Sequence, residues 1–328
     1  MYCEFTMRWQ IFSCGIFALT AALGQAQSYP AKPVRFIVPY PPGGATDIIA
    51  RSISGKLGAA LGQQFVVDNR AGGGQKIGTA LAAKSPADGH TMLLVSVTHS
   101  INPALDAKLP YDSVKDFVPV TLIASSPNAV VLHPSVPAKS LHDLIALARS
   151  RPNQLIYGSG GNGSPPHLTA ELFKSLTGTR MTHVPFKGSA PSVIALVGGQ
   201  VDLSFSTVAI TLPQIQAGRV RAIAVTSPKR SAALPNLPTL REAGPANMAD
   251  FESQQWFALF GPAALPRETI TRLNGEIMRW MESAEVRTRL SAEGAEPGQL
   301  TLEQFAAFIR SDATRWVKVV KASGATAD

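Results

Sequence analysis

Cysteine is almost absent from this chain of 328 residues, which contains only Cys3 and Cys14, both close to the N-terminus. Charged residues are also few, at 16% against 45% hydrophobic residues, which excludes a disordered chain and predicts a well-formed core. The sequence contains no G-x-S-x-G nucleophile motif, no Walker A loop and no H-E-x-x-H zinc pair. We therefore expect no catalytic residues, no cofactor and no metal site.

The first 26 residues predict a secretory signal peptide. Arg8 precedes an uninterrupted run of apolar and small residues over 11–23, and Gly24 and Ala26 place small residues before a cleavage site after Ala26. The run is too short to span a bilayer comfortably. Met7 is an alternative start. Because both cysteines lie in this leader, the mature chain would have neither disulfides nor thiolate chemistry, and we expect it in a bacterial periplasm.

Removing the leader leaves 302 residues, enough for two domains. The net charge of +8 is unchanged, since the leader carries one Arg and one Glu. The basic residues are scattered rather than clustered, and export also argues against a nucleic-acid partner. We interpret the charge as weak steering for small anions.

Strand-like and helix-like segments alternate along both halves of the mature chain. In the first half, strands are predicted at 34–38, 65–67 and 91–96, with helices at 47–61 and 77–84 between them. The same alternation restarts at 140–150, and a pair of helices closes the chain. Strands alternating with helices predict an α/β fold in which each domain is a mostly parallel sheet flanked by helices.

Two long extended runs, 119–133 and 255–262, interrupt this alternation. Each is typical of a segment that crosses between domains. We therefore predict a hinged architecture of two domains. Its first domain comprises 27–124 and 251–328, and its second comprises 125–250.

The segment from Phe36 to Asp47 joins an apolar strand to a helix through a Pro/Gly turn. Such a turn leaves backbone N–H groups free at the positive end of the helix dipole, which favours a bound anion. A plain turn capped by Thr46 or Asp47 is the alternative. Taken alone, the turn does not decide between them.

A second Gly-rich turn, 158–164, repeats this feature in the other half, and the loop at 185–191 is a third strand-to-helix turn. Hinged α/β domains bring such turns together across a shared cleft. Thr98, just after the third strand, could also reach the cleft, although a local capping role is the alternative. His167 and Glu171 form an i,i+4 pair, which usually lies on a solvated helix face.

Several motifs occur together in the order found in one known family. They are Pro39-Tyr-Pro-Pro-Gly-Gly-Ala-Thr-Asp47 with Ala50-Arg51, Asn69-Arg70, Leu109-Pro-Tyr-Asp112, Lys115-Asp-Phe117, Gly161-Asn-Gly-Ser164 with His167-Leu168, and His183-Val-Pro-Phe-Lys-Gly188. From about Tyr29 to the C-terminus, the chain resembles the substrate-binding receptors of tripartite tricarboxylate transporters, the TctC or Bug family.

This resemblance implies a two-domain receptor of the periplasmic-binding-protein or "Venus flytrap" kind. It would bind a small carboxylated solute between its domains and deliver it to the permease subunits of a tripartite tricarboxylate transporter. The protein would be monomeric. A sensory co-receptor for a membrane kinase, or a cleft enzyme on the same scaffold, are the alternatives. The ligand-binding residues implied are Tyr40, Pro42, Gly43, Gly44, Ala45, Thr46, Asp47, Thr98, Ser159, Gly160, Asn162, Gly163, Ser164, Lys187, Gly188, Ser189 and Ser206.

Two departures from the family pattern bear on the ligand. Ser206-Thr207 stands where many relatives carry Asp-Asn, so a partner for a ligand ammonium is missing and we expect a carboxylate without an amino group. The Asn69 turn has Ala71 instead of proline, and Gln75-Lys76 replaces a smaller pair. Lys76 either adds positive charge to the cleft or lies on the surface.

Overall fold

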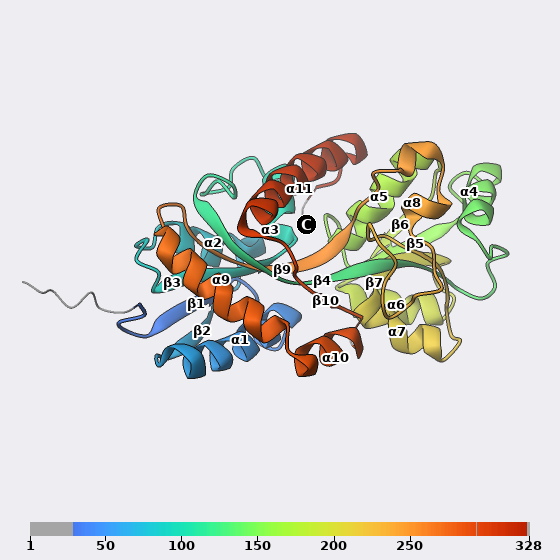
Figure 1. Ribbon diagram of the computed structural model, residues 1–328. Helices are drawn as coiled ribbons and strands as arrows, with labels where there is room; N and C mark the ends of the chain where they lie inside the picture. Colours follow the sequence, from blue (N-terminus) through green and yellow to red (C-terminus); the bar gives the residue numbers. More distant parts are fainter. Residues whose placement is uncertain (1–28, 293, 327–328) are drawn as a thin grey trace, which may run out of the picture.

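The computed structural model describes residues 29–292 and 294–326, so the predicted signal peptide lies outside the described residues. Two lobes lie side by side and share one sheet that runs through both of them (Figure 1). The strand order along this sheet is β2-β1-β3-β9-β4-β7-β5-β6, and β8 and β10 both pair with β4. The predicted α/β class is confirmed.

The first lobe is built from both ends of the described chain, and its outer strands β1, β2 and β3 are parallel. Its elements are β1 (Val34–Val38), α1 (Ala45–Leu61), β2 (Phe65–Asn69), η1 (Gly73–Gln75), α2 (Lys76–Ala83), β3 (Thr91–Ser96), α3 (Thr98–Leu105), α9 (Arg267–Met281), α10 (Ala284–Ala292), β10 (Glu296–Pro297) and α11 (Leu302–Ser323).

The second lobe comes from the middle of the chain, and its strands β5, β6 and β7 are also parallel. Its elements are α4 (Leu141–Ser150), β5 (Ile156–Ser159), α5 (Pro165–Thr177), β6 (Thr182–Pro185), α6 (Ser189–Val197), β7 (Leu203–Thr207), α7 (Val208–Gln216), β8 (Arg221–Val225), α8 (Leu240–Ala243) and η2 (Ala246–Met248).

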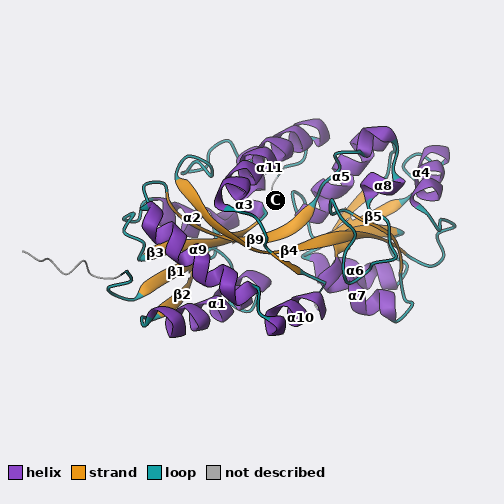
Figure 2. Ribbon diagram, in the orientation of Figure 1, coloured by secondary structure: helices purple, strands orange, loops and turns teal. Residues whose placement is uncertain are grey.

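Two long antiparallel strands, β4 (Phe117–Leu132) and β9 (Gln254–Pro262), join the lobes. They are the two extended runs predicted to cross between domains, and both pass through the centre of the molecule (Figure 2). β4 pairs with β9 up to Pro127 and with β7 from Asn128 onward. Because β4 continues without a break through residue 124, the domain boundaries drawn from the sequence remain a proposal.

Helices cover both faces of the sheet in each lobe, so each lobe has a hydrophobic cluster on either side. In the first lobe, Phe36 and Leu94 pack toward α1 and α9, whereas Trp256 and Phe260 pack toward α11. The second lobe is arranged likewise. Leu168 of α5 belongs to the α11 cluster, so the lobes touch through apolar side chains.

Local signals placed most of these elements well. Capping boxes at Ser140 and Thr301 mark the starts of α4 and α11. The helix α3 was missed, because it contains Pro103 and begins with Thr-His-Ser-Ile-Asn, most of which are weak helix formers.

Candidate functional site

The turn between β1 and α1 is held by the carboxylate of Asp47. This buried group accepts hydrogen bonds from the Gly43 N–H at 2.9 Å, from Arg51 Nε at 2.9 Å and from Asn69 Nδ2 at 3.0 Å. The hydrogen bond from Arg51, with those from Gly43 and Asn69, holds the pKa of Asp47 below its usual range despite burial. Neither Asp47 nor Thr46 is the helix cap; the carboxylate instead fixes the loop from inside.

Gly44 is the N-cap of α1, and it supplies no side-chain hydrogen bond to the helix. The first backbone bond of this helix runs from the Ile48 N–H to the Gly44 carbonyl, at 3.0 Å. The N–H groups of Ala45, Thr46 and Asp47 therefore have no intrahelical acceptor. The turn residues 41–45 are exposed, whereas Thr46 and Asp47 are buried, so an anion from solvent can reach this helix end only through the exposed turn.

Tyr40 links this turn to the end of β3. Its hydroxyl lies 2.7 Å from both Ser96 Oγ and Thr98 Oγ1. Thr98 in turn donates to Gln75 Oε1 at 2.8 Å. Burial raises the pKa of Tyr40, so the hydroxyl stays protonated and able to donate. The sequence indicated Tyr40 and Thr98 but gave Gln75 no role, although it marked that position as unusual for the family.

The second Gly-rich turn is stabilised from within the second lobe. Ser159 Oγ lies 2.7 Å from His183 Nε2 and donates to the Gly161 carbonyl at 3.1 Å. The N–H of Gly163 donates to His167 Nδ1 at 3.1 Å. Ser164 Oγ also donates to the Gly161 carbonyl, at 2.7 Å. The hydroxyls of Ser159 and Ser164 thus shape the turn, and the exposed side chain in it belongs to Asn162.

Three aromatic rings stack beneath this turn. The His167 and His183 rings are 4.0 Å apart and nearly parallel, and Tyr157 stacks on His183 at 4.8 Å. Tyr157 donates to Glu171 at 2.5 Å, and Lys174 lies 2.6 Å from the same carboxylate. The expectation that His167 and Glu171 lie on a solvated face is wrong. Their spacing showed one helix face, but not that this face packs inward.

The third turn lies against the second. The N–H of Gly188 donates to the Gly160 carbonyl at 3.2 Å, and a Cβ at Gly160 would lie 3.0 Å from Ser189 Oγ. A side chain at position 160 would therefore require these neighbours to move by a few tenths of an ångström. Lys187 is exposed beside it. The structure thus brings Ser159, Gly160, Gly188 and Ser189 together.

Two positions that the sequence linked to ligand choice, Ser206 and Lys76, have side-chain partners in the structure. Ser206 is fully buried, and its hydroxyl lies 2.7 Å from Ser204 Oγ within the sheet. Lys76 pairs with Asp106, so its charge is neutralised locally and is not free for a ligand. We expect Ser206 to act on the ligand through packing alone.

Gly163 carries the contact between the second turn and the first lobe. A Cβ there would lie 2.8 Å from Leu105 Cδ1 at the end of α3 and 3.3 Å from the Thr326 carbonyl. Its φ of +69° also favours glycine. The second turn thus lies against the end of α3 in the first lobe.

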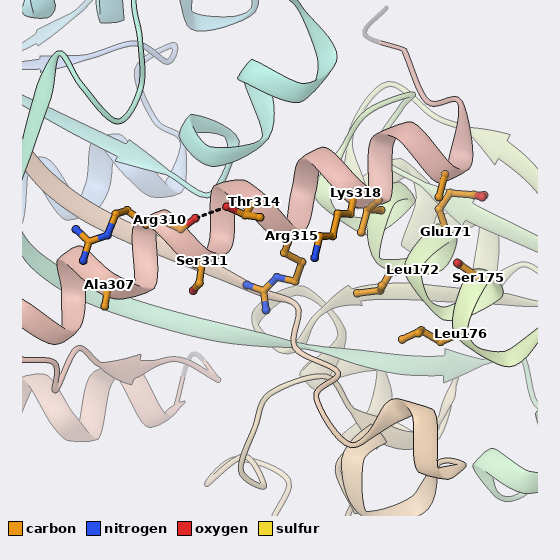
Figure 3. A pocket seen from close by; sticks show the side chains of 12 residues that line it. Glu171, Leu172, Ser175, Leu176, Ala307, Arg310, Ser311, Thr314, Arg315 and Lys318 are labelled. Atoms are coloured by element: carbon orange, nitrogen blue, oxygen red, sulfur yellow. Dashed lines mark hydrogen bonds between the residues drawn. The ribbon is translucent and has the colours of Figure 1, made fainter.

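Two cavities lie outside these turns. One of about 770 Å³ separates α5 from α11 (Figure 3), and a smaller one of about 180 Å³ lies between α1 and the α9–α10 pair. Within the described ranges, no three His, Cys, Asp or Glu side chains come together as metal ligands. No helix there is long and apolar enough to cross a membrane.

Two α/β lobes that share a sheet and are joined by two crossing strands define the class of bilobal solute-binding proteins. The model of the tripartite tricarboxylate transporter family receptors, TctC, matches residues 49–325. The chain belongs to this family.

Individual relatives agree with this assignment. Protein BugT of Bordetella pertussis is 38% identical over 316 residues, covering 95% of this chain and 96% of its own. The solved structure of R. palustris Rpa4515 with adipate is 38% identical, has a TM-score of 0.75, and is matched over 91% of this chain and 99% of its own. MatC (Rpa3494) from Rhodopseudomonas palustris with bound malate is 31% identical, with a TM-score of 0.72 and coverage of 89% and 100%.

Proposed function

We propose that this protein is a monomeric periplasmic receptor that captures a small carboxylate between its lobes and delivers it to the permease of a tripartite tricarboxylate transporter. The observation that carries the proposal is the N-terminus of α1. It presents three N–H donors without an intrahelical acceptor, those of Ala45, Thr46 and Asp47, beside an exposed turn that Asp47 keeps in place. Charge-assisted hydrogen bonds to such donors contribute about 1.5–3 kcal/mol each.

The second part of the proposed ligand site is the 158–164 turn together with Gly188 and Ser189. Its hydroxyls and rings are used internally, which keeps the turn rigid and leaves mainly backbone groups for a ligand. Rigid turns lose little conformational entropy when they bind. Adipate and malate in the solved relatives make a dicarboxylate the first ligand to test.

Whether the ligand carries an amino group depends on the residue at position 206. Ser206 is neutral, buried and bonded to Ser204, so it offers no charge to an ammonium group. We infer that the ligand is a carboxylate without an amino group.

Isothermal titration calorimetry with residues 27–328 tests this proposal. Acetate, malate, adipate and citrate form the panel, with aspartate, glucose and putrescine as controls. We expect at least one non-amino carboxylate to bind at micromolar or lower Kd. Binding of glucose or putrescine with no response to any carboxylate would contradict the proposal. Adding a membrane fraction with the permease or with a sensor kinase then separates transport from sensing.

A further inference from the structure

The groove between α5 and α11 is the largest cavity described above, and no family motif falls in it. Figure 3 shows α11 along one side and α5 along the other. Its volume is about 770 Å³. The residues lining it are Glu171, Leu172, Ser175 and Leu176 of α5, and Ala307, Arg310, Ser311, Thr314, Arg315, Lys318, Val319 and Ala322 of α11.

The two walls of this groove belong to different lobes. α5 starts directly after the second ligand turn, so the helix whose N-terminus borders the ligand site also carries Leu172 and Leu176 in the groove. Leu172 packs against the apolar cluster under α11. Any movement of the second lobe relative to the first therefore changes the groove, because its two walls are rigid helices.

The groove has an unneutralised positive charge. Arg315 pairs with Asp312 and with Glu252, and Glu171 is paired with Lys174. Arg310 and Lys318, by contrast, form no ion pair with any residue in 29–292 or 294–326. They lie eight residues apart on α11, which corresponds to about 12 Å along the helix axis.

The shape of the groove favours a chain segment over a small molecule. Its α11 residues extend from Ala307 to Ala322, about 22 Å along the axis. Arg310, Ser311, Thr314 and Lys318 are exposed, so a small ligand would stay largely in water. Small-molecule sites usually enclose most of their ligand, whereas grooves between helices commonly receive an amphipathic helix.

We propose that this groove docks an acidic amphipathic segment of the membrane permease. The segment has apolar side chains facing Leu172, Leu176 and Val319, and two carboxylates about two helical turns apart facing Arg310 and Lys318. Since the walls come from both lobes, the segment binds the arrangement in which α5 and α11 lie side by side. This inference rests on the proposed function, because it assigns the surface through which the loaded receptor is recognised.

Charge reversal in the groove tests this proposal. R310E/K318E reverses both free charges, and the matched control R287E/K321E makes the same change at exposed positions that do not line the groove. The full mature receptor is passed over nanodiscs that hold the permease subunits, with and without a mixture of malate and adipate. The affinity of all proteins for these acids is measured separately by calorimetry.

We expect R310E/K318E to weaken docking at least tenfold while its affinity for the acids changes less than twofold, and R287E/K321E to behave as the wild type. Equal docking of the two variants would overturn the proposal. A dimer of the wild type in light scattering that R310E/K318E abolishes would also overturn it, because the groove would then bind a second copy. Binding of sebacate that R310E/K318E abolishes would overturn it too, because the groove would then bind a small molecule. Failure of the wild type to bind any acid counts against the proposed function instead, and the groove is then judged on docking of the empty receptor.

Discussion

Replacing Ala45 with proline removes one N–H donor from the turn between β1 and α1 and leaves the helix intact. Ala45 is the first residue of α1, and Gly44 before it has φ −77° and ψ 166°, a conformation that a following proline favours. Proline is well tolerated at this position because its missing N–H has no intrahelical acceptor. We therefore expect the free energy of unfolding to change by less than about 0.5 kcal/mol.

The effect on binding is expected to be much larger. Loss of one charge-assisted hydrogen bond of about 1.5–3 kcal/mol raises the Kd about 10- to 150-fold. The matched control is Arg267→Pro, at the first position of α9, which also follows an extended residue. Calorimetry measures Kd, and chemical denaturation measures stability. If A45P and R267P bind the carboxylate equally well and A45P is as stable as the wild type, the helix N-terminus does not hold the ligand.

Three further predictions concern the scaffold around the site. Asp47→Ala removes three accepted hydrogen bonds, one from an exposed guanidinium, and should lower the free energy of unfolding by about 2–4 kcal/mol in urea denaturation; no change would show that the network is unimportant. Gly163→Ala should weaken carboxylate binding more than Gly178→Ala, because Gly178 has a similar φ but no neighbour within 4 Å. Adding Leu105→Ala to Gly163→Ala should partly restore binding. Equal Kd values for the two glycine variants would contradict this prediction. Burial lowers the pKa of His99 to about 4, so from about pH 6.5 down to about 4 the unfolded chain takes up a proton that the native state refuses. This lowers the free energy of unfolding by up to about 3 kcal/mol. His99→Phe should therefore flatten that part of the stability–pH profile. An unchanged slope would show that another group titrates there.

Local sequence signals were sufficient for the strands, most helices and both crossing strands. The β1–α1 and β5–α5 turns could be found because glycine-rich turns between an apolar strand and a helix are visible in a few consecutive residues. We predicted that these turns lie between the domains because the same pattern is repeated in both halves of the chain.

Contacts between distant residues could not be predicted in this way. Asp47 was assigned to the ligand or to a cap, but its carboxylate also accepts a hydrogen bond from Asn69, the last residue of a different strand, β2. The stack of Tyr157, His167 and His183 likewise joins three elements, and nothing in the spacing of His167 and Glu171 shows which side of α5 is buried. Ser206 alternates with Ser204 on one strand, but its burial depends on the neighbouring β4.

The claim that turns of both lobes bind the ligand is tested most directly by a backbone amide NMR titration. Residues 27–328 are titrated with the tightest-binding acid from the calorimetric panel. The account predicts downfield shifts of the amide protons of Ala45, Thr46 and Asp47, and concurrent shifts in the 159–164 turn, with one common Kd. Amide protons at the control helix start, Arg267, should not move. A carboxylate that binds tightly yet shifts the amides of only one lobe, or leaves those of 45–47 unchanged, would contradict the account.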